Sequence, residues 1–415
     1  MTNHDGIKSS LHKIHVLVAI GGGIAAYKVC ELISQLFKKE AKVKVILTES
    51  AQKFITPLTV SALSRHQAYT DADFWQPTHS RPLHIALGEW ADLMIIAPLT
   101  ANTLAKLVYG LGDNLLTNTV LASTCPIIVA PAMNTEMWLQ KSVQNNWQKL
   151  GEDKRYFSLH TNTGLLACDR YGQGRMAEAT EILTAIESVI ITNGKRDLVG
   201  KNVLISAGST REYLDYVRFI GNPATGKMGI ALACACYYRG ANVTLVAGNV
   251  SHELLQYTPP IQVISVVTAQ QMEKAMLSNF LQADIILMAA AVADVKPKHY
   301  FPDKLGKKSL PQSIELEYVT DIVAKLGESK KPSQKLIGFA AQTKDIVTPA
   351  MSKLIRKKLD AIVTNPIDKD NAGFGSDTNE AIFISKERKQ TVIPSTSKLL
   401  LAHRILDLVI NLSCG

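Results

Sequence analysis

The sequence predicts an α/β protein with doubly wound parallel sheets in two domains. Short β-branched runs alternate with helical stretches, which is typical of parallel strands covered by helices on both faces. Two unlike openings of strand, glycine-containing loop and helix begin at Ile14 and at Val203. A chain of 415 residues is long for one hydrophobic core, so two domains are the default. These observations favour two Rossmann-like units, each with a site of its own.

The first half opens with a strand-forming run from His15 to Ile20, the turn Gly21-Gly22-Gly23 and a helix from Ile24 toward Phe37. Glycine lets the backbone turn sharply and the helix N–H groups then face the turn, so an anion is its expected occupant. Further elements are expected in order at Val43 to Thr48 (strand), Pro57 to Leu63 (helix), Asp92 to Ala97 (strand), Leu99 to Val108 (helix) and Pro126 to Ala130 (strand). Ligands of such sheets gather at the carboxyl ends of the strands.

The second half begins after a helix that is expected to end near Val189. Residues 191–201 are polar and rich in turn-forming types, so we place the domains at 1–190 and 191–415. A late hairpin near Ala381 to Ser385 is expected to close the second sheet. Its other strands are expected at Val203 to Ser206, Val243 to Ala247, Ile285 to Ala289, Leu336 to Ala340 and Ala361 to Thr364.

Composition excludes several classes of protein. Apolar residues make up 47% and charged residues 20%, which is ordinary for a globular chain. The 45 Lys and Arg exceed the 36 Asp and Glu by nine, and the lysines at 296–308 and 353–358 suit solvated faces, phosphate-bearing ligands or nucleic acid alike. The six cysteines show no Cys-x-x-Cys pair, and no apolar run reaches the roughly 18 residues of a membrane helix. We therefore expect a cytoplasmic protein with reduced thiols and no membrane or nucleic-acid partner.

Three residues of the first half carry weak signals when each is taken alone. His84 precedes an expected strand and is more often a structural residue there. Asn134 is placed to cap the helix that follows it, and Cys168 could be one more buried small hydrophobe.

Together with their neighbours these residues resemble the flavin-dependent phosphopantothenoylcysteine decarboxylases. The matching motifs are Gly22-Gly23-Ile24-Ala25-Ala26-Tyr27-Lys28, Phe54-Ile55-Thr56-Pro57-Leu58, His84-Ile85, Ala97-Pro98 with Thr100, Pro131-Ala132-Met133-Asn134, and Ala167-Cys168 with Gly172, Gly174, Arg175 and Met176. The whole chain, from about Ile14 to the C-terminal helix, resembles the bacterial bifunctional family that joins this decarboxylase to a phosphopantothenate–cysteine ligase. The resemblance implies an N-terminal flavoprotein domain and a C-terminal nucleotide-binding ligase domain.

The resemblance implies FMN as the cofactor of the first domain. Loss of carbon dioxide from a cysteine carboxylate leaves charge on carbon, so the substrate thiol is first oxidised toward a thioaldehyde, with the flavin accepting the electrons. His84 is then expected to assist proton removal near the thiol, and Asn134 to orient the carboxylate. Cys168, as a thiol, is expected to protonate the enethiolate that forms. The expected flavin contacts are Gly22, Gly23, Ile24, Thr48, Thr100 and Asn102.

Two departures from the family pattern lie near this site. Gly21 stands where serine is common before the paired glycines, so a hydroxyl is lost there. Cys168-Asp169-Arg170-Tyr171 replaces a more usual Cys-Gly start, which keeps the thiol and changes the loop around it.

Motifs of the second half resemble the ligase. They are Ser206-Ala207-Gly208-Ser209-Thr210-Arg211-Glu212, Asp215, Val217-Arg218-Phe219-Ile220, Asn222, Thr225-Gly226-Lys227-Met228-Gly229, Ala290-Ala291-Val292-Ala293-Asp294, Gly338-Phe339-Ala340-Ala341 and Gly373-Phe374-Gly375-Ser376-Asp377. Taken alone, Arg211 and Asp215 are more readily interpreted as a helix-spaced ion pair than as a substrate clamp. Together with the other motifs of the family, the substrate clamp is favoured.

The resemblance implies that CTP activates 4′-phosphopantothenate as an acyl cytidylate, releasing pyrophosphate, and that the amine of cysteine then attacks the acyl group. Negative charge develops in both steps and calls for fixed donors and cations. Arg218 and Asn222 are the candidates beside the carboxylate and acyl oxygen. Lys304, on a basic loop, is the candidate cation over the reacting phosphate.

The remaining expected nucleotide contacts are Ala291, Asp294, Thr320, Asp321, Ile322, Val323, Phe339, Lys353 and Lys357. Asp294 is the candidate for contact with Mg²⁺, which phosphates and waters would mainly carry. Residues 320–323 open a helix whose N–H groups can receive phosphate. Lys353 and Lys357 are spaced to share one helix face, either toward a triphosphate or toward solvent. Three departures affect this region: Tyr318-Val319-Thr320 where proline is common, an inserted Gly306, and Gln342 in place of a glutamate.

Two other functions remain open from the sequence. One is a flavin-dependent decarboxylase of another thiol acid with a non-catalytic nucleotide-binding second domain. The other is a basic, nucleic-acid-associated flavoprotein, although no nucleic-acid module is recognised. The resemblance also suggests a homo-oligomer, with trimers of decarboxylase domains, the flavin near a subunit contact, and paired ligase domains.

Overall fold

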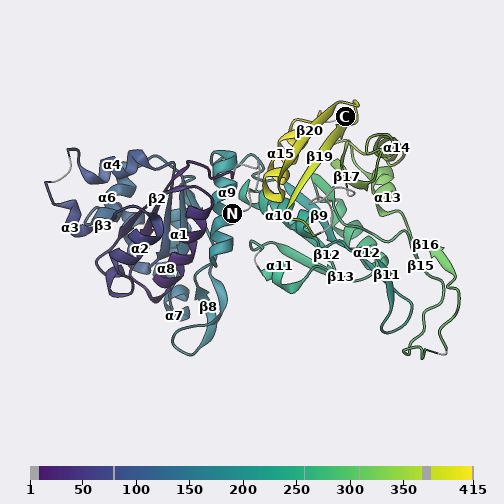
Figure 1. The fold of residues 1–415 in the computed structure, drawn as a ribbon, viewed down its shortest axis with the longest axis horizontal. Coiled ribbons are helices and arrows are strands. Elements are labelled where there is room, and N and C mark those ends of the chain that lie inside the picture. The colour runs from purple at the N-terminus through teal and green to yellow at the C-terminus, as the bar shows by residue number, and fades with distance from the viewer. Residues whose placement is uncertain (1–8, 78–79, 257, 308, 367–374, 414–415) are drawn as a thin grey trace, which may run out of the picture. The chain divides into compact units, whose positions relative to one another are not determined.

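The computed structural model describes residues 9–77, 80–256, 258–307, 309–366 and 375–413, and it confirms the predicted α/β class (Figure 1). The chain divides into two compact units, Met1–Gly194 and Lys195–Gly415. Each unit contains its own parallel sheet with helices packed on it. Within the described ranges, no helix has the length and apolar character needed to cross a bilayer.

The first unit is built on a six-stranded parallel sheet in the order β3-β2-β1-β4-β5-β6. Its strands are β1 (His15–Ile20), β2 (Lys42–Leu47), β3 (Ala68–Thr70), β4 (Leu93–Leu99), β5 (Ile127–Pro131) and β6 (Tyr156–Ser158), with β7 (Asn162–Leu165) and β8 (Tyr171–Arg175) forming a separate antiparallel hairpin. Its helices are η1 (Ile24–Lys28), α1 (Val29–Lys38), η2 (Ala51–Lys53), α2 (Pro57–Ser64), α3 (Asp71–Phe74), α4 (Leu83–Trp90), α5 (Ala101–Tyr109), α6 (Leu115–Ala122), α7 (Thr135–Leu139), α8 (Lys141–Glu152) and α9 (Ala179–Thr192).

One face of this sheet is covered by α4, α5, α6 and α8, whose apolar side chains pack on β1, β4 and β5. β4 is buried along its whole length, as expected for a central parallel strand. The expected helix from Ile24 toward Phe37 is modified: its first turn, η1, is a 3₁₀ helix, and the α-helix begins at Val29. Tight 3₁₀ turns are common at helix starts.

The second unit is built on an eight-stranded sheet in the order β13-β12-β9-β14-β17-β18-β19-β20. Its strands are β9 (Asn202–Gly208), β12 (Asn242–Gly248), β13 (Gln262–Val266), β14 (Ile285–Met288), β17 (Lys335–Gln342), β18 (Ala361–Pro366), β19 (Thr378–Ser385) and β20 (Gln390–Ser397). All neighbours are parallel except β18–β19 and β19–β20, so the expected closing hairpin is confirmed. The pairs β10 (Arg211–Tyr213) with β11 (Phe219–Gly221), and β15 (Val295–Pro297) with β16 (Leu316–Tyr318), are antiparallel.

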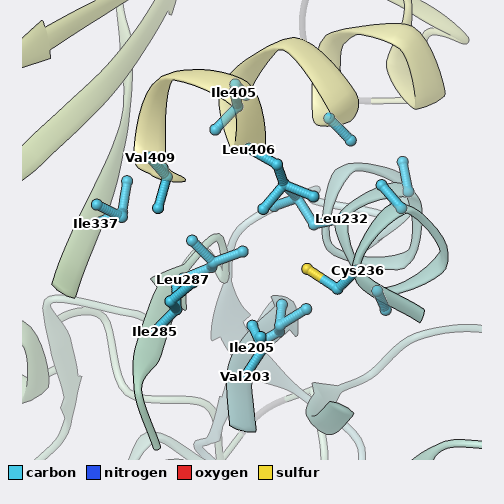
Figure 2. Close-up of a cluster of buried hydrophobic side chains, with 14 of the residues drawn as sticks. Val203, Ile205, Leu232, Cys236, Ile285, Leu287, Ile337, Ile405, Leu406 and Val409 are labelled. Atoms are coloured by element: carbon cyan, nitrogen blue, oxygen red, sulfur yellow. The ribbon is translucent and has the colours of Figure 1, made fainter. Parts of the chain in front are cut away.

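Helices cover both faces of this sheet. One face carries α10 (Lys227–Tyr238) and α15 (Lys398–Ile410), and the other carries α12 (Ala269–Phe280), α13 (Ile322–Ser329) and α14 (Thr348–Arg356); α11 (His252–Gln256) is a short helix after β12. Figure 2 shows the first face, where Leu406 of α15 and Leu232 of α10 lie close to Ile205 and Leu287 of the sheet. Complete burial of such a side chain contributes roughly 1.5–3 kcal/mol. This core fixes the carboxyl ends of β9, β14 and β17 at one edge.

Candidate functional site

A cavity of about 590 Å³ lies at the carboxyl edge of the first sheet. The glycine turn after β1, the start of α5 after β4 and the segment after β5 all reach it, as the topology predicts. Its lining is mainly apolar and comprises Gly22, Gly23, Ile24, Ala25, Tyr27, Lys28, Thr100, Ala101, Ala132, Met133, Asn134, Met137, Leu165, Leu166, Ala167, Cys168, Gly174, Arg175 and Met176.

Asn134 and Cys168 meet at this cavity. The Asn134 Nδ2 donates to the Cys168 Sγ over 3.2 Å, while its Oδ1 accepts from the Glu136 N–H over 2.8 Å. The expected capping role is therefore confirmed, and the same side chain also holds the thiol. Cys168 is exposed, so the interpretation as a buried small hydrophobe is wrong.

The β7–β8 hairpin carries Cys168 and docks closely on the segment after β5. Met133 N–H donates to the Gly174 carbonyl over 3.0 Å. Gly174 has φ +134°, and a Cβ there would lie 2.1 Å from the Met133 oxygen. A side chain at this position is therefore excluded by both backbone conformation and space. Glycine here lets the hairpin approach closely enough to place the thiol beside Asn134.

The glycine turn after β1 is packed equally tightly. A Cβ on Gly21 would lie 2.4 Å from the Pro98 oxygen, and one on Gly22 would lie 2.2 Å from the Ser50 Cβ. The serine that is common in the family at the position of Gly21 would require the backbone to shift in this chain. A Cβ on Gly23 would meet no atom closer than 3.9 Å, so the turn has space for a side chain there.

Two cations, Lys28 and Arg175, line the cavity. The sequence analysis named them as parts of the family motifs and gave them no role in the site. Lys28 Nζ lies 2.7 Å from Glu178 Oε1, and Arg175 Nη2 lies 3.3 Å from the same oxygen. Two positive charges share one carboxylate, which leaves an excess of positive charge. Because both residues belong to the family motifs, these motifs could have indicated that Lys28 and Arg175 lie at the site.

Three predicted residues of the first unit do not line this cavity. His84 lies in α4, edge-on to Phe74 at 5.4 Å, and its buried Nδ1 has no hydrogen-bond partner within the described part of the chain. The Thr48 hydroxyl oxygen accepts from Ala51 N–H, at the start of η2, over 3.2 Å. Asn102 is exposed on α5. Cys168 lines the cavity, whereas His84 is absent from its lining, so the structure does not bring the two together there.

In the second unit, Asp215 fixes Arg218. The Asp215 side chain is inaccessible to solvent and forms an ion pair with Arg218. Burial alone would raise the pKa of Asp215, but N–H groups of Arg218, Val217 and Leu305 and the Arg218 guanidinium lower it to about 2. A helix-spaced Arg211–Asp215 pair, the interpretation of the two residues taken alone, is not found, because Arg211 lies in β10 and stacks on Phe219 at 4.7 Å.

The same carboxylate anchors the lysine loop. Leu305 N–H donates to Asp215 over 3.2 Å, and Arg218 donates to the Leu305 carbonyl over 3.2 Å. The exposed Lys304 therefore lies next to a fixed point beside Arg218. Asn222 Nδ2 lies 3.4 Å from the carbonyl oxygens of both Ala291 and Val292. The first contacts join Arg218 to the Lys304 loop, and the second join Asn222 to the segment after β14.

The expected nucleotide residues are arranged around α13. Asp321 caps the helix by accepting from Ala324 N–H over 3.1 Å, and Lys357 Nζ lies 2.9 Å from Asp321. Burial would raise the pKa of Asp321, but Lys357 and the cap lower it. Thr320 is exposed, and Ile322 is a core residue that can contribute only its N–H. Lys357 is the C-cap of α14, which ends at Arg356, and its N–H donates to the Lys353 carbonyl over 3.0 Å, as in a continuing helical turn.

A second cavity, of about 140 Å³, lies at the carboxyl ends of β9, β14, β17 and β18. Among the predicted residues, it is lined by Ala291 and Phe339; its remaining lining is Gly208, Ala224, Thr225, Gly226, Lys227, Met228, Gly229, Ala289, Ala290, Ala340, Ala341, Asn365, Gly375, Asn379 and Lys398. Gly373 and Phe374 of the family motif lie outside the described residues. Asp294 is exposed, and the described ranges contain no group of three or more His, Cys, Asp or Glu suited to hold a metal ion.

Both units match known families. Residues 6–191 match the family described as "Flavoprotein", and residues 198–412 match the "DNA/pantothenate metabolism flavoprotein C-terminal domain". The coenzyme A biosynthesis bifunctional protein CoaBC of Bacillus subtilis (strain 168) is 43% identical over 403 residues, which are 97% of this chain and 98% of that protein. The chain belongs to the family of coenzyme A biosynthesis bifunctional proteins.

Another member of this family, from Escherichia coli (strain K12), is 37% identical over 95% of this chain and 96% of its own length. Similar solved structures include the C-terminal domain of CoaBC, with 34% identity and TM-score 0.43 over 52% of this chain and 96% of that one. A mutant PPC decarboxylase complexed with pantothenoylaminoethenethiol has 37% identity and TM-score 0.39 over 42% of this chain and 97% of its own. The family is therefore bifunctional, with a flavoprotein domain followed by a second enzymatic domain.

Proposed function

We propose that this chain joins 4′-phosphopantothenate to cysteine in the second unit and decarboxylates the product to 4′-phosphopantetheine in the first. The observation that best supports the proposal is the Asn134–Cys168 contact at the mouth of a large apolar cavity. It places an amide donor and a thiol acid together, and the near full-length similarity to bifunctional relatives supports the pairing with a ligase.

The first cavity fits FMN. Its volume of about 590 Å³ lies within the range of roughly 300–1,000 Å³ that cofactor sites occupy. Ile24, Met133 and Met137 provide apolar surface that an FMN molecule could contact. Lys28 and Arg175 provide positive charge for its phosphate. Bound FMN would accept electrons from the substrate thiol and so allow the carboxylate to leave. Gly22, Gly23, Ile24 and Thr100 would hold it, and their position in the cavity lining supports this role.

Asn134 and Cys168 then act on the substrate. The Asn134 amide can donate a hydrogen bond to the carboxylate and position it. Cys168 can deliver its proton to the enethiolate carbon that remains after carbon dioxide has left. Their 3.2 Å contact would hold the thiol toward the same substrate end that the amide binds.

His84 would complete this site from a neighbouring subunit. It lies outside the cavity of its own chain and carries a buried ring nitrogen without a partner among the described residues. Individual exposed apolar side chains of the first unit, including Leu58 at 79% and Tyr171 at 78% exposure, offer surface for such an assembly. We infer trimers of the first unit and pairing of the second.

In the second unit, Arg218, Asn222 and Lys304 would perform the activation with CTP and Mg²⁺. Arg218, held by Asp215, can neutralise the substrate carboxylate as it approaches the nucleotide. Asn222 can donate to the acyl oxygen, and Lys304 can stabilise charge on the reacting phosphate. Asp294, α13 and Lys353 would receive the nucleotide and its ion. None of the five cysteines that the structure describes forms a disulfide, which fits a cytoplasmic enzyme.

The test incubates the purified protein with 4′-phosphopantothenate, cysteine, Mg²⁺ and either CTP or ATP, and identifies the products by mass. We expect a yellow protein that releases pyrophosphate with CTP and forms 4′-phosphopantetheine. A protein that stays colourless after reconstitution with FMN, and releases no pyrophosphate, would contradict the proposal.

A further inference from the structure

Residues 206–210 belong to a family motif of the second unit that the proposed reaction does not use. They form the end of β9 and the loop that leads to β10. Gly208 has φ +77°, a conformation that favours glycine, and a Cβ there would overlap the Gly248 carbonyl. The chain therefore turns where β9 ends, and Ser209 and Thr210 run alongside the segment that follows β14.

Backbone contacts join this loop to the segment after β14. Ser209 pairs with Ala291 in the same parallel register that joins β9 to β14. Ala291 N–H donates to the Gly208 carbonyl over 2.8 Å, and Thr210 N–H donates to the Ala291 carbonyl over 3.4 Å. The pairing of the two strands thus continues past their ends.

Two buried hydroxyl groups bind further N–H groups of the same segment. The Thr210 hydroxyl oxygen accepts from Ala293 N–H over 2.9 Å, and the Ser206 hydroxyl oxygen accepts from Ala290 N–H over 3.2 Å. Both hydroxyl-bearing residues are inaccessible to solvent, and Ala293 is buried as well. Loss of the Thr210 hydroxyl would therefore leave a buried N–H without an acceptor, which is more costly than loss of an exposed contact.

Thr210 binds this segment on both sides of Val292. Its N–H holds the Ala291 carbonyl, and its hydroxyl holds Ala293 N–H. The carbonyls of Ala291 and Val292 are also the two that contact Asn222 Nδ2, each at 3.4 Å. The positions of both carbonyls therefore depend on Thr210.

These carbonyls determine how the amide of Asn222 is turned. The amide nitrogen carries two N–H donors. When one of them is directed toward the carbonyls after β14, the other is left for an oxygen of the ligand. A donor whose direction is fixed before the reaction stabilises developing negative charge without further reorganisation.

We propose that Thr210 is a positioning residue for amide formation in the second unit. It fixes the two carbonyls that orient the amide of Asn222. The inference rests on the proposed ligase function, in which Asn222 donates to the acyl oxygen. Because Thr210 is fully buried, it acts on the reaction only through the segment that it holds.

The test compares the full-length wild-type protein with Thr210→Val, Thr210→Ser and the matched control Thr268→Val. Valine keeps the shape of threonine and removes the hydroxyl, whereas serine keeps the hydroxyl. Thr268 is a suitable control because its hydroxyl also accepts from a backbone N–H, that of Gln271 over 3.2 Å, at the start of α12. Hydrogen exchange of residues 290–294, followed by mass spectrometry, measures the anchoring without turnover. Amide formation gives kcat and KM.

We expect Thr210→Val to speed exchange in residues 290–294 by about tenfold or more, because Ala293 N–H loses its acceptor. The kcat of amide formation should fall about tenfold, while KM for CTP and 4′-phosphopantothenate stays within about twofold. Thr210→Ser should recover most of the rate. Thr268→Val should lower the unfolding temperature by about 2–4 °C, as Thr210→Val does, and cause neither effect.

A double-mutant comparison separates positioning from a loss of stability. In an Asn222→Ala background the amide is absent, so Thr210→Val should slow the residual amide formation by less than about twofold. The same loss in both backgrounds would reduce Thr210 to a structural role and overturn the inference. If Thr210→Val does not fold, Thr210→Cys serves instead, because its thiol is a weak acceptor.

Two further outcomes would overturn the inference. Unchanged exchange of residues 290–294 in Thr210→Val would show that Thr210 does not hold the segment. A raised KM for CTP with unchanged kcat would assign its effect to nucleotide binding. A wild-type protein that forms no amide from 4′-phosphopantothenate and cysteine would contradict the proposed function, and the exchange data would still decide whether Thr210 anchors the segment.

Discussion

The two candidate sites differ in volume, in the polarity of their lining and in the kind of ligand that they suit. The first unit has a cavity of about 590 Å³ with an apolar lining, whereas the second has about 140 Å³ at the sheet edge and several cations near it. The first suits a large cofactor that supplies the difficult chemistry. The second suits reactions in which charge on phosphates and acyl oxygens must be stabilised.

The second unit also holds its cations differently. Arg218, Lys227 and Lys357 each pair with an aspartate, and the pKa of each partner is lowered. These carboxylates stay ionised at neutral pH and keep the cations in place before any ligand binds. The comparison teaches that each cation of the second site has an aspartate of its own, whereas in the first site Lys28 and Arg175 share Glu178 and close backbone packing at Gly174 positions the Cys168 hairpin.

The largest effect is expected from Asn222→Asp, which separates the two sites functionally. The new carboxylate would face the Ala291 and Val292 carbonyls and repel the acid substrate. Amide formation should fall about 10²–10³-fold, the usual loss for one donor to an oxyanion. Decarboxylation of supplied phosphopantothenoylcysteine should be unchanged. Asn242→Asp, an exposed substitution at the opposite edge of the sheet, is the control.

Lys304→Gln is also expected to reduce amide formation and to leave decarboxylation unchanged. Its loss removes a cation from the phosphate without altering the Asp215 contacts that anchor the loop. If decarboxylation fell together with amide formation in either variant, the separation of the sites would be wrong. Product masses from the two half-reactions give the answer.

Cys168→Ala should impair only the first site, at a late step. Carbon dioxide should still be released, but the saturated thiol should form at a rate lower by about 10²-fold or more, because general acid catalysis contributes about that much. An oxidised or unsaturated product should accumulate and be detected by mass. Cys30→Ala, a half-buried cysteine in α1, serves as control. Normal saturated product from the Cys168 variant would remove this residue from the mechanism.

Gly174→Ala tests the backbone packing that distinguishes the first site. The added Cβ meets the Met133 oxygen at 2.1 Å with φ at +134°, so the β7–β8 hairpin must move. Strain of about 1–3 kcal/mol predicts a loss of decarboxylation of about tenfold with normal ligation. Gly151→Ala, with open space around it, should change neither rate. Equal activity of both variants would show that the hairpin position is not critical.

The smallest effect concerns the stability of the second unit. His403 is fully buried, and burial and then the Arg239 charge lower its pKa to about 3; Arg239 is itself paired with Asp197 and Asp407. Since the unfolded histidine titrates near about 6.5, the unfolded state alone takes up the proton between these values. Stability of the second unit should therefore fall as pH decreases from about 6.5 toward 3.

His403→Leu removes this dependence. The difference in unfolding free energy between variant and wild type should change by up to about 1.4 kcal/mol per pH unit within that window and be constant above it. Calorimetry of the full chain at several pH values measures the difference. Parallel pH dependence in both proteins would contradict a neutral buried His403.

The sequence predicted the sheets better than the sites. Strands such as β4 and β9 are recognised because buried parallel strands are continuous apolar runs. The start of α1 was misplaced because a 3₁₀ turn has the same apolar pattern as the helix it precedes. The four-residue spacing of Arg211 and Asp215 alone suggested a helical ion pair, because spacing does not distinguish a helix from a strand and turn, and Arg211 lies in β10.

Site residues could be predicted where a motif carried them and not where tertiary contacts did. Asn134 and Cys168 come together through the close docking of Gly174, which the spacing of the motif only hints at. Lys398 gave no signal, since a lysine at the start of a helix is ordinary until its burial is known. For His84 the motif predicted a role in the site, but the structure of the single chain leaves this residue outside the cavity.

The most direct test of two independent reactions in one chain measures carbon dioxide and pyrophosphate together for the wild-type protein. With phosphopantothenoylcysteine supplied, we predict carbon dioxide without CTP and without pyrophosphate. With 4′-phosphopantothenate and cysteine, both should appear in equal amounts and both should stop when CTP is omitted. A CTP requirement for decarboxylation of the supplied intermediate would contradict the account.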